Sequence, residues 1–191
     1  MPEDESTLHL TDPRAMRALA HPTRLRLLGE LRVRGPQSVG MLSEIVDEAV
    51  GSVSYHLGKL AEHGFIREAP EHARNRRERW WRAAHTRTAW EPVAVLADPE
   101  LKLASDLLRR AALQRYVEKF QDYLDAEATL DPAWVRGTAS SDHFLHLTPD
   151  ELVELRGDLE ALSARWVARS DPGRPDARTV TLIYQAFRGP Q

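Results

Sequence analysis

Residues 50–66 read VGSVSYHLGKLAEHGFI, and this stretch decides the fold. Its apolar residues recur at intervals of three and four, which predicts a helix over residues 49–63 with one buried stripe. The stripe consists of Val50, Val53, Leu57 and Leu60. The other face carries hydrogen-bonding side chains of modest size in place of the usual exposed Glu, Lys and Arg; these are Ser52, Ser54, Tyr55, His56 and Lys59. We interpret this face as a recognition surface.

Three further helices are predicted before this stretch. Asp12, followed by a proline, is a typical helix start with a capping side chain. His21, also followed by a proline, begins a second helix that ends at Gly35. Ser38 caps a third and shorter helix, VGMLSEIV. Residues 1–11 are predicted to form a mobile tail.

A basic hairpin is predicted after the stretch. FIREAPE and RWWRA are typical of strands, and residues 72–79, HARNRRER, form the turn between them. The turn is rich in guanidinium groups, and these belong to Arg74, Arg76, Arg77 and Arg79. A hairpin tip of this kind favours contact with a phosphate backbone or a narrow minor groove.

The predicted element order is that of a winged helix-turn-helix. Helix 49–63 would then lie in the DNA major groove, where small hydroxyl groups allow a close approach to base edges. A face of Ser, Tyr and His is, by itself, more often an ordinary solvent face, and an Arg-rich turn is more often a solvated loop. Their occurrence together, in this order of elements, favours binding of double-stranded DNA.

The charge distribution agrees with an anionic partner for the first half of the chain. Residues 6–90 hold 14 Lys and Arg against 9 Asp and Glu, whereas residues 91–191 hold 12 against 17. The net charge of −3 therefore conceals a basic first half and an acidic second half.

Composition excludes several classes of protein. Hydrophobic residues make up 42% and charged residues 29% of the 191 residues, which is typical of a folded globular protein. The absence of cysteine excludes disulfides, thiolate metal sites and cysteine nucleophiles, and it agrees with a reducing cytoplasm, where we expect the protein. Because the N-terminus is acidic and lacks a hydrophobic stretch, we expect no signal peptide, and because no apolar run is long enough, we expect no membrane span.

Two stretches carry a resemblance to a known family. ALAHPTRLRLLGEL at 18–31 and SVSYHLGKLAEHGFI at 52–66 resemble the bacterial ArsR/SmtB-type winged-helix transcriptional regulators, over about residues 12–86. RERWWRA at 77–83 is similar to the end of the wing in a branch with a longer C-terminal half. The resemblance implies a homodimer that binds a partly palindromic operator and usually represses transcription. It also implies that bases are faced by Ser52, Ser54, Tyr55 and His56, and that the wing is held by Arg74, Arg76 and Arg77.

The sequence departs from the best-known sensors of that family. Their cysteines are missing from helix VGMLSEIV, and their histidines are missing from PELKLASDLLRRAALQRYVEKFQDYLD. His143 and His146 lie three residues apart in a predicted strand, so they would point to opposite faces, and no third ligand is near in the sequence. We therefore predict no metal site and no cofactor. A ligand-responsive or metal-responsive sensor with a non-standard site stays open as an alternative.

The longest predicted helix covers residues 99–127, with two apolar stripes side by side. A helix that is apolar over so wide an arc needs cover on two sides, from its own domain and from a symmetry mate. Burial within one chain is the alternative. We predict that the dimer interface contains Leu101, Ala104, Leu108, Ala112, Tyr116 and Phe120.

The remaining sequence predicts a strand, a helix and a strand. HFLHL at 143–147 reads as the first strand, Thr148 and Glu151 form a capping box, and RTVTLIYQAF at 178–187 reads as the last strand. The helix carries a seam of Leu152, Leu155, Leu159, Leu162 and Trp166. The aromatic residues of this half favour a core over a ligand pocket, so a small-molecule effector stays open; they are Trp90, Trp134, Phe144, Trp166, Tyr184 and Phe187.

The fold class expected is mainly α with a small β component (α+β). Residues 12–86 form the predicted DNA-binding domain, and residues 87–191 form a dimerisation and possible effector domain. The sequence contains no phosphate loop, nucleophile elbow, HExxH or paired-carboxylate signature, so we expect no enzyme. A winged helix used for protein–protein contact is the remaining rival, although such a module has no need of a basic wing.

Overall fold

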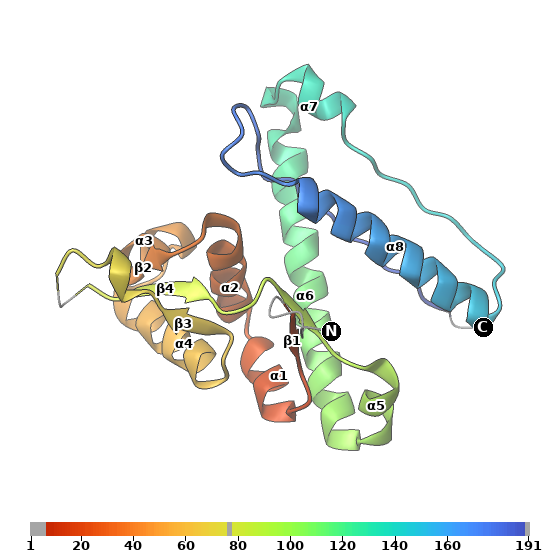
Figure 1. Cartoon of the computed structure of the whole chain (residues 1–191), viewed down its shortest axis with the longest axis horizontal. Coiled ribbons are helices and arrows are strands. Elements are labelled where there is room, and N and C mark those ends of the chain that lie inside the picture. The colour runs from red at the N-terminus through yellow and green to blue at the C-terminus, as the bar shows by residue number, and fades with distance from the viewer. Residues whose placement is uncertain (1–6, 76–77, 190–191) are drawn as a thin grey trace. The chain divides into compact units, whose positions relative to one another are not determined.

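The computed structural model describes residues 7–75 and 78–189 and divides into two compact units, Met1–Asp125 and Ala126–Gln191 (Figure 1). Among the described residues, no helix has both the length and the apolar character that crossing a membrane requires. The boundary predicted between residues 86 and 87 divides the chain by function and does not coincide with the division between the two compact units. It stays a prediction.

The first unit begins with a short strand, β1 (Thr7–His9), which pairs in parallel with β5 (Arg87–Ala89). Leu10 follows the strand and is buried in the core. The prediction of a mobile tail is therefore wrong for residues 7–10, because their backbone and one large apolar side chain have partners that lie about 80 residues away in the sequence.

Helices α1 (Pro13–Leu19), α2 (Pro22–Arg34) and α3 (Val39–Val46) begin at the predicted caps. The Asp12 carboxylate accepts from the Arg14 amide at 2.8 Å, and the Ser38 hydroxyl accepts from the Met41 amide at 3.2 Å. His21 caps α2 through its ring, since Nδ1 accepts from the Thr23 amide at 3.2 Å. The three predicted starts are confirmed.

Helix α4 (Val50–Glu62) completes the helix-turn-helix, and Gly64 ends it with a φ of +72°. It packs on α1, α2, α3 and the following strand. Val53, Leu57 and Leu60 are fully buried, as predicted, whereas Val50 is exposed because it occupies the first turn, beyond the edge of the core.

The wing is a small antiparallel sheet beside α4 (Figure 1). Strands β3 (Ile66–Glu68) and β4 (Trp80–Ala83) form the predicted hairpin, and a 3-10 turn, η1 (Pro70–His72), follows β3. A further strand, β2 (Gln37–Ser38), pairs with the other edge of β4. Trp81 of β4 is buried and joins the sheet to the helical core.

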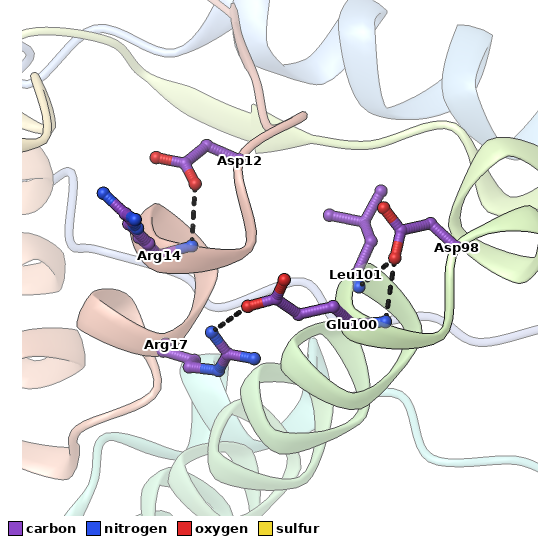
Figure 2. Close-up of polar contacts among 6 residues, drawn as sticks. All are labelled: Asp12, Arg14, Arg17, Asp98, Glu100 and Leu101. Carbon is purple, nitrogen blue, oxygen red and sulfur yellow. Dashed lines mark hydrogen bonds and ion pairs between the residues drawn. The ribbon is translucent and has the colours of Figure 1, made fainter.

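Helices α5 (Pro92–Ala97) and α6 (Pro99–Ala126) end the first unit. The Asp98 carboxylate caps α6 by accepting from the amides of Glu100 and Leu101, and Glu100 forms an ion pair with Arg17 of α1 at 2.8 Å (Figure 2). The first turn of α6 thus lies against α1 of its own chain.

One face of α6 is buried within the chain. Leu101, Ala104 and Leu108 belong to the core of the first unit, so their assignment to a dimer interface is wrong: their side chains are already covered by the chain's own residues. Ala112 is half-buried, and Tyr116 and Phe120 are exposed. The second stripe of α6 is exposed, and it consists of Leu103, Leu107, Leu113, Val117 and Leu124.

The second unit contains η2 (Glu127–Thr129), α7 (Pro132–Arg136) and α8 (Pro149–Arg169). The capping box predicted at the start of α8 is present, with the Glu151 carboxylate accepting from the Thr148 amide at 2.7 Å. Leu152, Leu155 and Leu159 of the predicted seam are half-buried.

The strands predicted at 143–147 and 178–187 are wrong. Neither segment is paired with another strand in the described part of the chain, and Phe144 and Val180 are 90% and 74% exposed. An alternating apolar pattern gives a strand only where a neighbouring backbone completes the ladder of hydrogen bonds. The overall class, mainly α with a small β component, is confirmed.

The packing of α4 yields a first prediction. Leu57→Ala should lower the free energy of unfolding by about 2–5 kcal/mol, because it opens a cavity at a fully buried position. Tyr55→Ala is the control on the same helix: it removes a side chain that is 60% exposed and should change stability by less than about 0.5 kcal/mol. Urea denaturation followed by circular dichroism measures both. Equal losses would contradict the orientation of α4.

Candidate nucleic-acid interface

The exposed face of α4 is narrow and built mainly from small residues. Gly51, Ser54, Tyr55 and Gly58 lie at helical spacings of three and four, so they share one side of the helix. Tyr55 is 60% exposed and is the one large side chain among the four. This side of the helix therefore presents little side-chain bulk, apart from the protruding Tyr55 ring and its hydroxyl group.

The two glycines are functional candidates that the sequence pattern did not single out. A Cβ added at Gly51 or Gly58 would have no atom within 4 Å, so neither glycine is required by packing inside the chain. Glycine in an exposed helix destabilises it by about 0.5–1 kcal/mol relative to alanine. Two such residues on one face are explained if another molecule approaches the helix backbone closely there. The signal was available in the sequence, as glycines seven residues apart on the outward side.

The start of α4 is fixed by one carboxylate. Glu48 accepts from the Thr23 hydroxyl at 2.6 Å and from the Ser52 hydroxyl at 2.8 Å. These hydrogen bonds, first that from Thr23 and then that from Ser52, hold the pKa of Glu48 below its ordinary value although partial burial opposes the shift. Ser52 is therefore engaged within the protein, and only a rotation of its side chain would free the hydroxyl for a base.

The placement of His56 on the outward face is wrong. His56 is 8% exposed and its ring lies 4.5 Å from that of His21, measured between centroids. It lies three residues after Val53 and four before Leu60, both fully buried, so the helix turns it toward α2. The polarity of His56 suggested an outward position, but the helical period places it on the same buried side as Val53 and Leu60.

The cations beside this face have acidic partners. Lys59 contacts Glu62 at 2.8 Å, and this hydrogen-bonded ion pair raises the pKa of Lys59. Arg79 of the wing contacts Glu68 at 2.5 Å and lies 4.8 Å from the centroid of the Trp81 ring. Exposed ion pairs stabilise a protein by at most about 1 kcal/mol, so a phosphate group can displace these carboxylates at little cost.

The tip of the wing is described on both sides of its centre. Arg74 is exposed and its backbone amide donates to Glu78 at 2.9 Å, which orders the start of the turn. Arg76 and Arg77 lie outside the described residues. The role of all four arginines in DNA contact stays a prediction.

A cavity of about 310 Å³ lies in the first unit. Its lining comes from α2, the turn before α4 and α6, and consists of Pro22, Thr23, Arg26, Glu48, Ala111, Gln114, Arg115 and Glu118. The charged groups in it are already used, since Arg26 donates to the carbonyls of Ile45 and Val46 and Arg115 pairs with Glu118 at 3.2 Å. The aromatic residues considered as a ligand pocket do not line this cavity.

Comparison with protein families finds a match for part of the first unit. Residues 19–69 match a family described as "Helix-turn-helix domain". None of the curated proteins matches the chain.

Two solved structures are similar to part of this chain. One is the homodimeric winged helix-turn-helix DNA-binding domain of a possible ArsR-family transcriptional regulator from Mycobacterium bovis, with 20% identity over 58% of this chain and 80% of that chain and a TM-score of 0.33. The other is a crystal structure of an ArsR family transcriptional regulator, with 24% identity over 59% of this chain and 89% of that chain and a TM-score of 0.31.

The exposed glycines give a second prediction. Gly51→Ala and Gly58→Ala should each raise the free energy of unfolding by about 0.5–1 kcal/mol, because alanine favours the helix and meets no neighbour. Gly64→Ala is the matched control and should lower it by about 1–2 kcal/mol, since Gly64 has a positive φ. Thermal or urea unfolding measures all three. A loss of stability in either helical variant would mean that a packing role explains these glycines.

Proposed function

We propose that this protein is a sequence-specific regulator of transcription of the ArsR type that binds double-stranded DNA as a dimer. The observation that carries the proposal is the exposed face of α4, where two glycines without a packing role flank Tyr55. A major groove admits a helix, and small residues let its backbone come near the base edges.

The roles within the interface follow from exposure. Ser54 and Tyr55 are proposed to contact bases, with Ser52 joining them after it leaves Glu48. Lys59 and the wing arginines, Arg74, Arg76, Arg77 and Arg79, are proposed to contact phosphates. His56 is not proposed as a base contact, because it is buried between α4 and α2.

Dimerisation is proposed to use the exposed stripe of α6. Five large aliphatic side chains of this helix are exposed together with Tyr116 and Phe120, a larger apolar surface than a single helix normally presents to water. A two-fold interface covers it by placing the same surface of a second copy against it. The dimer would present two α4 helices to successive major grooves, about 34–36 Å apart on a partly palindromic operator.

The proposed regulator is a repressor that acts in the cytoplasm. Residues 12–86 are proposed to bind DNA, and residues 87–191 to dimerise and to receive a small-molecule effector if one exists. Occupation of a promoter by a dimer without a catalytic part hinders transcription by steric exclusion.

The DNA-binding proposal is tested by fluorescence anisotropy. The full chain should prefer its own upstream promoter duplex over a shuffled duplex by about 10³-fold or more, with an affinity that falls steeply with salt. Tyr55→Ala should weaken promoter binding by about tenfold or more, because it removes the protruding base contact. Phe144→Ala, at a 90% exposed aromatic residue of the second unit, is the control and should leave binding unchanged.

Binding that is equal for both duplexes, or insensitive to Tyr55→Ala, would contradict sequence recognition by α4. Absence of binding to either duplex at low salt would favour the protein–protein module instead.

The dimer proposal is tested by sedimentation. Leu113→Glu should convert the dimer to a monomer at micromolar concentration, because it places two carboxylates in an apolar interface. Val93→Glu, at an exposed position of α5, should leave the mass unchanged. A wild-type monomer, or a dimer that tolerates Leu113→Glu, would contradict the assignment of this stripe.

A further inference from the structure

Two histidines are in contact where the buried face of α4 meets the start of α2. The rings of His21 and His56 lie 4.5 Å apart between centroids and are tilted by 39°. His56 comes from the middle of α4 and is 8% exposed, and its Nδ1 atom is buried and has no hydrogen-bond partner among the described residues. His21 is the residue that caps α2.

The cap of α2 requires a neutral imidazole. Nδ1 of His21 accepts a hydrogen bond from the Thr23 amide at 3.2 Å. A protonated imidazole carries a hydrogen on both ring nitrogens and has no acceptor left, so protonation of His21 removes this hydrogen bond. Neutral His21 is thus a condition of the helix start.

The charged and titratable groups around the two rings come from α2, from α4 and from the turn before α4. Arg24 of α2 donates through Nε to the Ala18 carbonyl of α1, and its charge lies near both imidazoles. In the described part of the chain, the acidic group that acts on both rings is Glu48, in the turn before α4, and it already accepts from Thr23 and Ser52. The Tyr55 ring contacts the His56 ring edge-on, with 5.3 Å between the ring centroids.

Burial, the first cause, and the Arg24 charge, the second, lower the pKa of both histidines, while Glu48 opposes the shift. For His21, the neighbouring His56 lowers the pKa further. Burial outweighs the attraction of Glu48, so the two rings stay neutral at a pH where an exposed histidine is partly protonated.

We propose that the His21–His56 contact is a proton-sensitive latch that holds α4 on α2 only while both imidazoles are neutral. Protonation of either ring removes the cap of α2 or places a positive charge beside the other ring and Arg24. The latch belongs to the fold itself, and only its effect on DNA affinity rests on the proposed function.

The sign of the pH dependence follows from proton uptake. An unfolded histidine has a pKa of about 6.5, and in the folded chain the two pKa values are lower. Stability is therefore complete above about pH 6.5 and falls as the pH decreases from there toward the folded pKa values. The folding equilibrium constant decreases about tenfold per pH unit for each proton that only the unfolded chain binds.

The test is the unfolding equilibrium of the full chain between pH 8 and pH 5, for wild type and two double variants. His21→Asn with His56→Phe keeps a capping side chain and a buried ring but cannot titrate. His143→Asn with His146→Asn removes two exposed histidines of the second unit and is the matched control. The control should keep the wild-type slope of unfolding free energy against pH. The latch variant should lose the part of this slope that corresponds to the uptake of up to two protons on unfolding.

A latch variant that keeps the full wild-type slope would overturn the proposal. NMR titration of the wild-type histidine rings is the second measurement and needs no variant: two rings should titrate below pH 6.5, and ordinary titration of both would equally overturn it. DNA affinity, measured at pH 7.5 and pH 6.0, should fall on acidification in wild type and less in the latch variant. Failure of DNA binding at both pH values would contradict the proposed function, whereas the stability slope alone decides the latch.

Discussion

The burial of three side chains, Val53, Leu57 and Leu60, is the constraint on which the rest of the first unit depends. These residues fix the rotation of α4 about its own axis against α1, α2 and α3. Once that rotation is set, the 3.6-residue period decides which side chains face water and which face the core. The small exposed face and the buried His56 are therefore two consequences of the same packing.

Polar contacts then refine the position that packing defines. Glu48 ties the first turn of α4 to Thr23, and the His21 ring both caps α2 and touches His56. All of these groups lie at the contact between α2 and α4. A change in their hydrogen bonds or protonation therefore affects the position of the helix proposed to contact DNA. The same unit extends into α6, whose first half is part of the core and whose exposed stripe is the proposed dimer surface.

Local signals in the sequence were sufficient for helices α1 to α4, α6 and α8. Caps at Asp12 and Ser38, the capping box at Thr148 and the apolar period of α4 each depend on residues a few positions apart, and each is present in the structure. What the sequence could not supply is pairing over long distances. Strand β1 needs β5, and the segments 143–147 and 178–187 carry strand patterns without a paired neighbour in the described chain. The outward face of α4 was predicted in outline, but the inward orientation of His56 and the open space beside Gly51 and Gly58 follow only from the packing of the helix.

Hydroxyl-radical footprinting of the full chain tests the central claim most directly, that the exposed face of α4 binds DNA. Tyr55 and Phe144 are both exposed aromatic residues and both react readily with the radical. At saturating promoter duplex, the oxidation rate of Tyr55 should fall several-fold while that of Phe144 stays the same. An unchanged rate at Tyr55, with DNA demonstrably bound, would contradict the account.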